Sequence, residues 1–422
     1  MPIYALCDMN SFYVSAELLF RPDLVDKPCI VLSNNDGCAV ARNAPAKALG
    51  IKMGAPRFEI EEIIHERGVI TFSSNYTLYA DISNRVMTTL ERLAPSVFIY
   101  SIDEAFLDLS GMENLGPLDT FGRSVVDTVK REVGIPCCLG ISTTKTLAKL
   151  ANEGAKKYPK TAGVVNLTDP QRQRRLMAIT DVGDVWGVGR RIGKRLNELG
   201  ISTALDLADA NPAWIRKHFS VVLERTVREL NGIACIPFDD NPPHKKQIVV
   251  SRSFGQRITQ LSDMRQAISS YMTKAAEKLR NEGMNAGVVT VFFRTNVFNQ
   301  NQPQYSNSVS RTLTQPSSDT RELIRIANEL LSSIWKDGYA FMKAGVMLSD
   351  FYEKSITQQG LFDVQPVDER STQLMATLDK INRQKKGQVT FARDGISQSW
   401  QMKRENLSPC YTTRWSDLPK AR

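Results

Sequence analysis

The sequence predicts a multidomain α+β protein. The 422-residue chain is too long for one hydrophobic core, because single cores stop growing at about 250–300 residues. Between residues 75 and 168 predicted strands and helices alternate, which is typical of an α/β or α+β domain. A basic, wholly helical pattern follows over 169–235, and a second mixture of strands and helices occupies 247–350. We therefore expect several domains, each with a core of its own.

The N-terminal region predicts a strand, a helix and a small insertion. An apolar run ends at Asp8, and Asn10 or Ser11 can cap the helix that follows. Cys29–Leu32 and Cys38–Ala41 are short apolar runs on either side of an Asn- and Gly-containing turn. This spacing predicts a β-hairpin.

Longer elements follow, and their hydrophobic periodicity separates helices from strands. The predicted helices are Leu78–Leu93, Leu118–Val133, Asp263–Arg280 and Asp319–Lys336. The predicted strands are Phe98–Leu109 (a pair or one bent strand), Cys137–Ile141, Gln247–Ser251, Val288–Arg294 and Ala344–Ser349. The proline-rich stretch 236–246 predicts a linker. The polar region 351–422 predicts a weakly folded tail.

Composition excludes some classes of protein and favours others. The net charge of +9 makes a polyanionic partner plausible. No run approaches 18 apolar residues, so we expect no transmembrane helix and no membrane partner. The N-terminus does not resemble a signal peptide, and the seven scattered cysteines form no CxxC pair and no Cys/His cluster. We therefore expect a cytoplasmic protein with neither disulfides nor a zinc site.

Three carboxylates carry the clearest chemical signal. Asp8 ends an apolar strand, and Asp103 and Glu104 lie within another apolar stretch. A single acid at a strand end is more often a cap or a solvated charge, but burying unpaired carboxylates is costly unless a cation is present. Three carboxylates and a triphosphate suit two-metal chemistry with Mg²⁺. Adjacent strand residues point to opposite faces, so these acids converge only if the chain turns between them.

The residues around these acids resemble a known family. Asp8-Met-Asn-Ser-Phe-Tyr-Val and Tyr100-Ser-Ile-Asp-Glu-Ala resemble the two signature motifs of Y-family DNA polymerases. The stretches 32–38, 72–76 and 407–414 resemble the UmuC subfamily, and the similarity extends over essentially the whole chain. It implies a DNA-directed DNA polymerase that performs error-prone translesion synthesis in the SOS DNA-damage response.

The resemblance also implies a right-hand polymerase architecture with palm, small fingers, helical thumb, little finger and C-terminal tail. The expected ranges are palm 1–20 and 75–168, fingers 21–74, thumb 169–235, linker 236–246, little finger 247–350, and tail 351–422 for clamp and partner docking.

Catalytic and metal-binding roles follow from the same resemblance. Asp8, Asp103, Glu104 and the backbone carbonyl of Met9 would hold two Mg²⁺ ions, with a dNTP as the substrate.

Further residues would bind the nucleotide. Tyr13 matches the family's steric gate, which excludes a 2′-hydroxyl, and Phe12 lies beside it. The alternative is that both are ordinary core aromatics. Arg42 and Lys47 are candidates to hold the triphosphate, and which of them does so stays open, because the general family pattern is not kept at this place. Lys156 matches a palm lysine that reaches the triphosphate.

The predicted thumb carries a DNA-binding signal. Gly187 and Gly189 before a basic helix resemble a helix–hairpin–helix, whose backbone N–H groups contact phosphate. A Gly-rich nucleotide-binding loop is the alternative, but it needs a preceding strand. The basic residues expected to contact primer-template DNA, including two in the little finger, are Arg190, Arg191, Lys194, Arg195, Arg252 and Arg257.

Partners are inferred from the tail. Gln358, Leu361 and Phe362 resemble the short peptide that binds the beta sliding clamp. The resemblance further implies a UmuD′-like dimer and RecA as partners. Two other classes of protein would explain part of the pattern: a non-catalytic DNA-binding repair scaffold, and another two-metal palm enzyme such as a nucleotide cyclase. The presence of Asp8, Asp103 and Glu104 argues against the scaffold, which does not need them. The basic thumb argues against the nucleotide cyclase, which does not need one.

Overall fold

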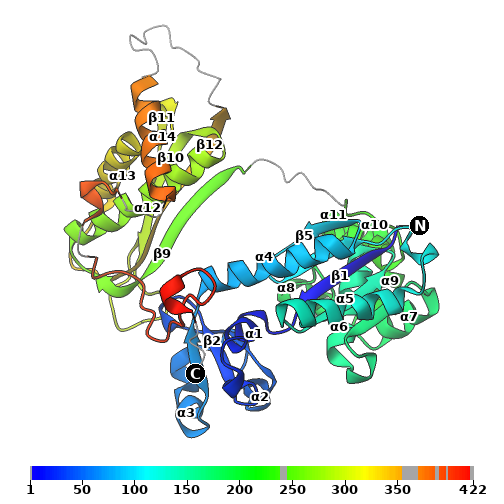
Figure 1. Ribbon diagram of the computed structural model, residues 1–422. Coiled ribbons are helices and arrows are strands. Elements are labelled where there is room, and N and C mark those ends of the chain that lie inside the picture. Colours follow the sequence, from blue (N-terminus) through cyan, green and yellow to red (C-terminus); the bar gives the residue numbers. More distant parts are fainter. Residues whose placement is uncertain (1, 238–244, 354–368, 385–388, 396–397, 419–422) are drawn as a thin grey trace. The chain divides into compact units, whose positions relative to one another are not determined.

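The structure is a computed structural model that describes residues 2–237, 245–353, 369–384, 389–395 and 398–418 (Figure 1). The chain divides into two compact units. Unit 1 contains Met1–Ser33, Gly37–Pro242 and Asn406–Arg422, and unit 2 contains Asn34–Asp36 and Pro243–Glu405. Each end of the chain therefore belongs to unit 1.

Unit 1 is built on a mixed sheet. Within the described residues its strands lie in the order β5-β6-β1-β7-β8. They are β1 (Tyr4–Met9), β5 (Ser96–Ile99), β6 (Glu104–Asp108), β7 (Cys137–Ser142) and β8 (Val164–Leu167). The central β1 pairs antiparallel with both β6 and β7, and all of its residues are buried.

Helices cover both faces of this sheet. The core formed with α4 (Tyr76–Leu93) and α5 (Leu118–Val133) includes Ala5 and Cys7 of β1. The opposite face packs against α6 (Lys145–Lys157).

The alternation of β1 decides where Asp8 points. Tyr4 and Leu6 pack with Ala148 of α6. Successive strand residues point to opposite faces, so Asp8 faces the same side as Tyr4 and Leu6. Helix α6 therefore supplies the side chains that surround Asp8.

A small insertion follows the first helix, α1 (Phe12–Leu18). Its strands lie in the order β3-β2-β4 within the described residues. The insertion's elements are β2 (Cys29–Leu32), β3 (Ala39–Arg42), α2 (Ala44–Ala48), α3 (Arg57–Glu66) and β4 (Ile70–Ser73). β2 and β3 pair antiparallel, which confirms the predicted hairpin.

Short helices make up residues 170–230 of unit 1. They are α7 (Pro170–Ala178), α8 (Arg190–Glu198), α9 (Ala204–Asp209), α10 (Pro212–His218) and α11 (Val221–Leu230). Their apolar residues form one cluster that includes Leu147, Leu150 and Ala151 of α6. The predicted helical character of this region is confirmed.

Unit 2 is a second α/β body. Its described strands lie in the antiparallel order β11-β10-β12-β9. Its elements are β9 (Gln247–Ile258), α12 (Leu261–Asn281), β10 (Met284–Arg294), β11 (Ser306–Ser317), α13 (Thr320–Ile334), β12 (Phe341–Glu353) and α14 (Glu369–Arg383). Helices α12 and α13 share one core with the sheet, and Figure 1 shows them with α14 in this unit.

Three sequence expectations differ from the structure. The strand β11 was not predicted, because its residues are mostly polar. The region after 351 is not uniformly weakly folded, since α14 forms and its Asp379 is 2.7 Å from Arg280 of α12. Ser11 precedes α1 with φ +47°, and its side chain makes no capping hydrogen bond within the described chain.

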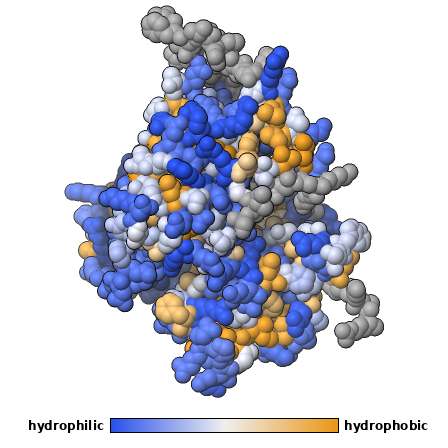
Figure 2. All heavy atoms as spheres, turned by 90° about the vertical axis from the view of Figure 1, so that its left-hand side faces the viewer, coloured by the Kyte–Doolittle hydropathy of each residue, from blue (hydrophilic) through white to orange (hydrophobic). Residues whose placement is uncertain are grey.

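One face of the molecule is predominantly polar (Figure 2). The face drawn in Figure 2 carries hydrophilic residues between smaller hydrophobic patches. In the part of the chain that the structure describes, no helix is both long and apolar enough to cross a bilayer.

Candidate active site

Strand pairing brings the predicted acids together. In the β1–β6 register Asp8 lies directly opposite Glu104. The Met9 N–H donates to the backbone carbonyl of Asp103 at 2.9 Å. Opposed residues of an antiparallel pair project from the same face, so Asp8 and Glu104 both face α6.

A turn separates the two adjacent acids. β6 begins at Glu104, and Asp103 lies just before it in a bent segment. The Ser101 hydroxyl accepts from the backbone N–H of Asp103 (3.2 Å) and of Glu104 (3.0 Å). The same hydroxyl donates to the Asp103 carboxylate at 2.6 Å. Ser101 therefore provides the turn that convergence of these acids requires.

Two lysines of α6 neutralise the carboxylates. Lys156 Nζ lies 2.6 Å from Asp8 Oδ2, and Lys149 Nζ lies 3.0 Å from both oxygens of Glu104. Burial raises the pKa of Asp8 to about 7; Lys156 opposes this rise and Glu104 adds to it. The Lys149 ammonium also sits over the rings of Tyr100 and Trp186, 4.4 and 5.1 Å from their centroids.

The donor atoms fit a hard divalent cation, although the carboxylates are held by protein partners. Among the described residues no group of three or more His, Cys, Asp or Glu side chains stands together as a metal site. Asp8 and Glu104 are nevertheless opposed carboxylates in a largely buried place that needs positive charge. A cavity of about 200 Å³ lies at Glu104, Lys149 and Lys156. Carboxylates beside such a space suit Mg²⁺ once the ammonium groups withdraw.

Tyr13 is held by a group of aromatic rings from α4. It stacks on Tyr79, with centroids 4.5 Å apart and an interplanar angle of 15°. Tyr76 meets it edge-on at 6.0 Å. Tyr13 is half-buried, whereas Phe12 is 3% exposed and belongs to the core. Phe12 is thus an ordinary core aromatic. The Tyr13 ring is held by Tyr79, and part of it stays accessible.

The two candidate phosphate ligands differ in their surroundings. Within the described residues Arg42 has two buried donors, Nε and Nη1, without a hydrogen-bond partner. Lys47 is exposed, and its Nζ is 3.4 Å from the Ser11 hydroxyl. Buried donors without partners are costly unless a ligand satisfies them, so this difference favours Arg42 as the stronger anion ligand.

Comparison with known families covers both units. A model of the impB/mucB/samB family matches residues 7–153, and the model of that family's C-terminal domain matches 245–361. A domain of unknown function, DUF4113, matches 372–421.

Curated relatives match over almost the full length. Protein UmuC of Salmonella typhimurium is 53% identical over 99% of both chains. Protein ImpB of Salmonella typhimurium is 51% identical over 100% of both, and Protein MucB of Escherichia coli is 49% identical over 99% of both. The chain belongs to the UmuC-type Y-family DNA polymerases. The family expected from the two acid motifs is confirmed.

Solved structures agree with this family. A Y-family DNA polymerase chimera of Dbh and Dpo4 superposes with a TM-score of 0.66, at 21% identity, over 83% of this chain and 100% of that chain. This UmuC-type chain therefore has the multidomain polymerase fold predicted for it. As a DNA-directed DNA polymerase of this family it performs translesion synthesis, and the relatives give no support to a non-catalytic scaffold.

The glycine turn of the polymerase leads into a basic helix. Gly187 has φ +90°, a conformation that favours glycine, and Gly189 is the N-cap residue of α8. A three-residue 3₁₀ helix, Val182–Asp184, precedes them rather than a strand, so the alternative of a Gly-rich dinucleotide loop is wrong. The four predicted contact residues of α8 are all exposed: Arg190, Arg191, Lys194 and Arg195.

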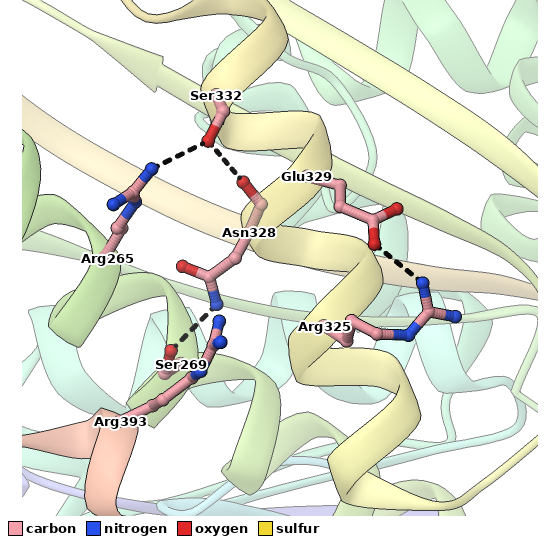
Figure 3. A pocket seen from close by; sticks show the side chains of 7 residues that line it. All are labelled: Arg265, Ser269, Arg325, Asn328, Glu329, Ser332 and Arg393. Carbon is pink, nitrogen blue, oxygen red and sulfur yellow. Dashed lines mark hydrogen bonds and ion pairs between the residues drawn. The ribbon is translucent and has the colours of Figure 1, made fainter.

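Unit 2 carries the remaining basic candidates. Arg252 and Arg257 are exposed on β9. A hollow of about 570 Å³ lies between α12 and α13 (Figure 3). Two of the arginines that line it have partners of their own, with Arg325 2.6 Å from Glu329 and Arg265 3.2 Å from the Ser332 hydroxyl. This hollow lacks the carboxylate set, so it is not the reaction centre.

The expected clamp peptide lies outside the described residues. Gln358, Leu361 and Phe362 fall within 354–368, so the clamp motif stays a prediction from the sequence.

Sequence reasoning missed three residues near the site. Lys149, Glu17 and Tyr79 are not among the site residues predicted from the sequence. Pairing between elements reveals them, because Lys149 reaches Glu104 and Tyr79 donates to Glu17 at 2.7 Å. For Lys149 the available signal was its position, seven residues before Lys156 on one helix, because that spacing places both on one face.

Proposed function

We propose that Asp8, Asp103 and Glu104, with the carbonyl of Met9, hold two Mg²⁺ ions for nucleotidyl transfer. When bound, such ions activate the primer 3′-hydroxyl and stabilise the leaving pyrophosphate. The protein's part is to fix the carboxylates through the β1–β6 register and the Ser101 turn. Before the ions bind, Lys156 balances the negative charge of Asp8, and Lys149 balances that of Glu104.

The nucleotide is proposed to lie beside the first helix. Tyr13, supported by Tyr79, closes the space at the sugar C2′ and excludes ribonucleotides. Phe12 contributes the packing beneath it. Arg42 is proposed as the main triphosphate ligand, because its Nε and Nη1 are donors without a hydrogen-bond partner among the described residues. Lys47 and Lys156 add positive charge.

Four regions of the chain are proposed to form the palm, fingers, thumb and little finger of a right-hand polymerase. The sheet of β1, β5, β6, β7 and β8 with its helices is the palm, and the β2–β4 insertion is the fingers. The helices of 169–235 are the thumb, where Gly187, Gly189 and the basic residues of α8 hold the primer-template backbone. After the linker 236–246 comes the little finger, which contacts DNA through Arg252 and Arg257.

Regulation is proposed to follow the family pattern. The enzyme acts in the bacterial cytoplasm during the SOS response, with a UmuD′-like dimer, RecA and the beta sliding clamp as partners. Support comes from the full-length similarity to Protein UmuC. The tail after residue 351 is proposed to dock the clamp and these partners.

The observation that carries this function is the pairing of Asp8 with Glu104, next to the Asp103 turn. Primer extension opposite an abasic site, with Mg²⁺ and the partner proteins, tests it. We expect Asp103→Asn to lower extension by about a hundredfold or more, while DNA binding stays at the wild-type level. Asp108→Asn, at the far end of β6, is the matched control and is expected to extend normally. If Asp103→Asn loses DNA binding as well, Asp103 does not have the assigned role.

A further inference from the structure

A C-terminal segment of unit 1, Asn406–Leu418, lies against residues from the start of the chain. The Ser73 N–H donates to the Asn406 carbonyl at 2.9 Å, and the Asn406 N–H donates to the Ser73 hydroxyl at 3.0 Å. Tyr411 stacks on Phe20 with centroids 4.5 Å apart. The segment lies in the matched domain of unknown function, and it is docked by polar and aromatic contacts together.

The segment is bound to the first turn of α4. Asn75 caps that helix, since its Oδ1 accepts from the Leu78 N–H at 3.3 Å. The Asn75 amide also donates to the Ser408 carbonyl at 3.1 Å, the Ser408 hydroxyl at 3.0 Å and the Pro409 carbonyl at 3.3 Å. The Asn75 side chain therefore joins the C-terminal segment to the first turn of α4, which bears Tyr76 and Tyr79.

Ser408 also reaches a buried acid on α1, one helical turn after Tyr13. Its hydroxyl donates to Glu17 Oε1 at 3.0 Å, and the Tyr79 hydroxyl donates to the same oxygen at 2.7 Å. Glu17 and Tyr79 are both 0% exposed, and Ser408 is 9% exposed. Since a buried carboxylate is unfavourable without donors, these two hydroxyls fix the position of Glu17, and Glu17 in turn fixes the Tyr79 hydroxyl.

Tyr79 transmits this restraint to Tyr13. Its ring stacks nearly parallel on that of Tyr13, so a shift of the Tyr79 ring moves the surface on which Tyr13 rests. Packed interiors pass on small displacements because they contain few voids. Ser408 does not touch Tyr13, and any influence on the nucleotide must pass through Glu17 and Tyr79.

We propose that the C-terminal segment sets the selectivity of the polymerase for deoxyribonucleotides. Ser408 is a positioning residue: it holds Glu17, Glu17 holds Tyr79, and Tyr79 holds Tyr13 in place against the sugar. This inference rests on the proposed steric-gate role of Tyr13. It assigns a role in sugar selection to a segment that otherwise has only partner docking proposed for it.

The test measures single-nucleotide incorporation by the full chain with its partner proteins. The readout is kcat/KM for a dNTP divided by kcat/KM for the matching rNTP. Ser408→Ala is expected to lower this ratio about three- to tenfold, the effect of losing the hydrogen bond to the Glu17 carboxylate. The variant also loses the bond that the hydroxyl accepts from Asn75, but the Asn75 amide keeps the Ser408 and Pro409 carbonyls as acceptors. Ser408→Thr keeps the hydroxyl and is expected to keep the ratio. Ser416→Ala, an exposed serine of the same segment, is the matched control.

A second variant separates positioning from simple stability. Tyr79→Phe removes the other donor to Glu17, and we expect it to lower the ratio too. Because Ser408 acts through Tyr79, the double variant Ser408→Ala, Tyr79→Phe should lower the ratio by less than the product of the two single fold-changes. If Ser408→Ala lowers the dNTP and rNTP efficiencies equally, or changes neither, the proposal is wrong.

Tyr13→Ala distinguishes failure of this inference from failure of the proposed function. If Tyr13→Ala admits ribonucleotides while Ser408→Ala leaves the ratio unchanged, the steric gate stands and the role of the segment is rejected. If Tyr13→Ala does not admit ribonucleotides, both are rejected.

Discussion

Lys156 Nζ lies 2.6 Å from Asp8 Oδ2, so the carboxylate at the end of β1 carries its own counter-charge. The same lysine is proposed to contact the triphosphate, and it must then leave the Asp8 carboxylate to bind the triphosphate. Lys156→Ala is therefore expected to raise the KM for dNTP about tenfold, the value of one charge-assisted contact. Lys157→Ala is the control, because this neighbour is exposed. Steady-state incorporation measures both, and an unchanged KM for Lys156→Ala contradicts the assignment.

Arg42 and Lys47 are expected to differ in their importance for nucleotide binding. Arg42 has two buried donors without partners in the described structure, so Arg42→Ala is predicted to raise the KM for dNTP about tenfold, and Lys47→Ala only about threefold. Arg42→Lys should be intermediate, because an ammonium keeps the positive charge but does not place donors where Nε and Nη1 of the guanidinium lie. Lys52→Ala, an exposed lysine of the same insertion, is the control. A larger effect for Lys47→Ala would assign the triphosphate to Lys47.

The basic face of α8 is expected to give DNA binding its dependence on salt. Removing both Arg191 and Lys194 should weaken binding of all DNA sequences alike. Each lost phosphate contact lowers the slope of log affinity against log salt by about 0.9. We therefore expect the double variant to flatten the slope by about two in a fluorescence-anisotropy titration. An Arg123→Ala, Lys130→Ala pair on α5, also exposed, should keep the wild-type slope; equal slopes in the two pairs would exclude α8 from the interface.

Glu17 is expected to make stability depend on pH. Burial raises the pKa of this carboxyl above its ordinary 4.5, and the Tyr79 and Ser408 hydroxyls oppose the rise. Between pH 4.5 and the higher folded-state pKa only the unfolded chain has released its proton, so stability falls as the pH rises through this interval. Above the folded-state pKa the loss is complete and constant.

Glu17→Gln removes this titration. Its melting temperature relative to wild type should rise as the pH increases from about 4.5 and then level off. Thermal melts at a series of pH values measure the difference, with Glu91→Gln, an exposed acid of α4, as the control. A difference that does not change with pH would show that Glu17 has the same pKa in both states.

Local pattern was sufficient for most elements. The predicted helix Leu118–Val133 matches α5 residue for residue, because its apolar positions repeat at helical spacing. The strand β11 has little such signal, since it lies at the sheet edge with few buried residues. Edge strands need fewer apolar side chains, and alternation alone then fails to identify them.

The candidate site was predictable only as far as its residues matched a motif. Asp8, Asp103 and Glu104 could be found this way, and the structure adds the register that joins two of them. Glu17 could not be found, because an acid in a helix normally faces solvent. Its burial depends on Tyr79, 62 positions away, and on Ser408, 391 positions away. The residues next to Glu17 in the sequence do not indicate either contact.

The distance between Asn75 and Ser408 in the chain, 333 positions, has a consequence for biosynthesis. The ribosome releases the first strand and the tyrosines of α4 long before it makes the residues that lock them. A product that ends before Ser408, through a nonsense codon or protease cleavage, leaves Glu17 with Tyr79 as its one hydroxyl donor among the described residues. Translation must therefore pass codon 408 before both hydroxyl donors to Glu17 are present, so the contacts beneath Tyr13 are completed late in synthesis.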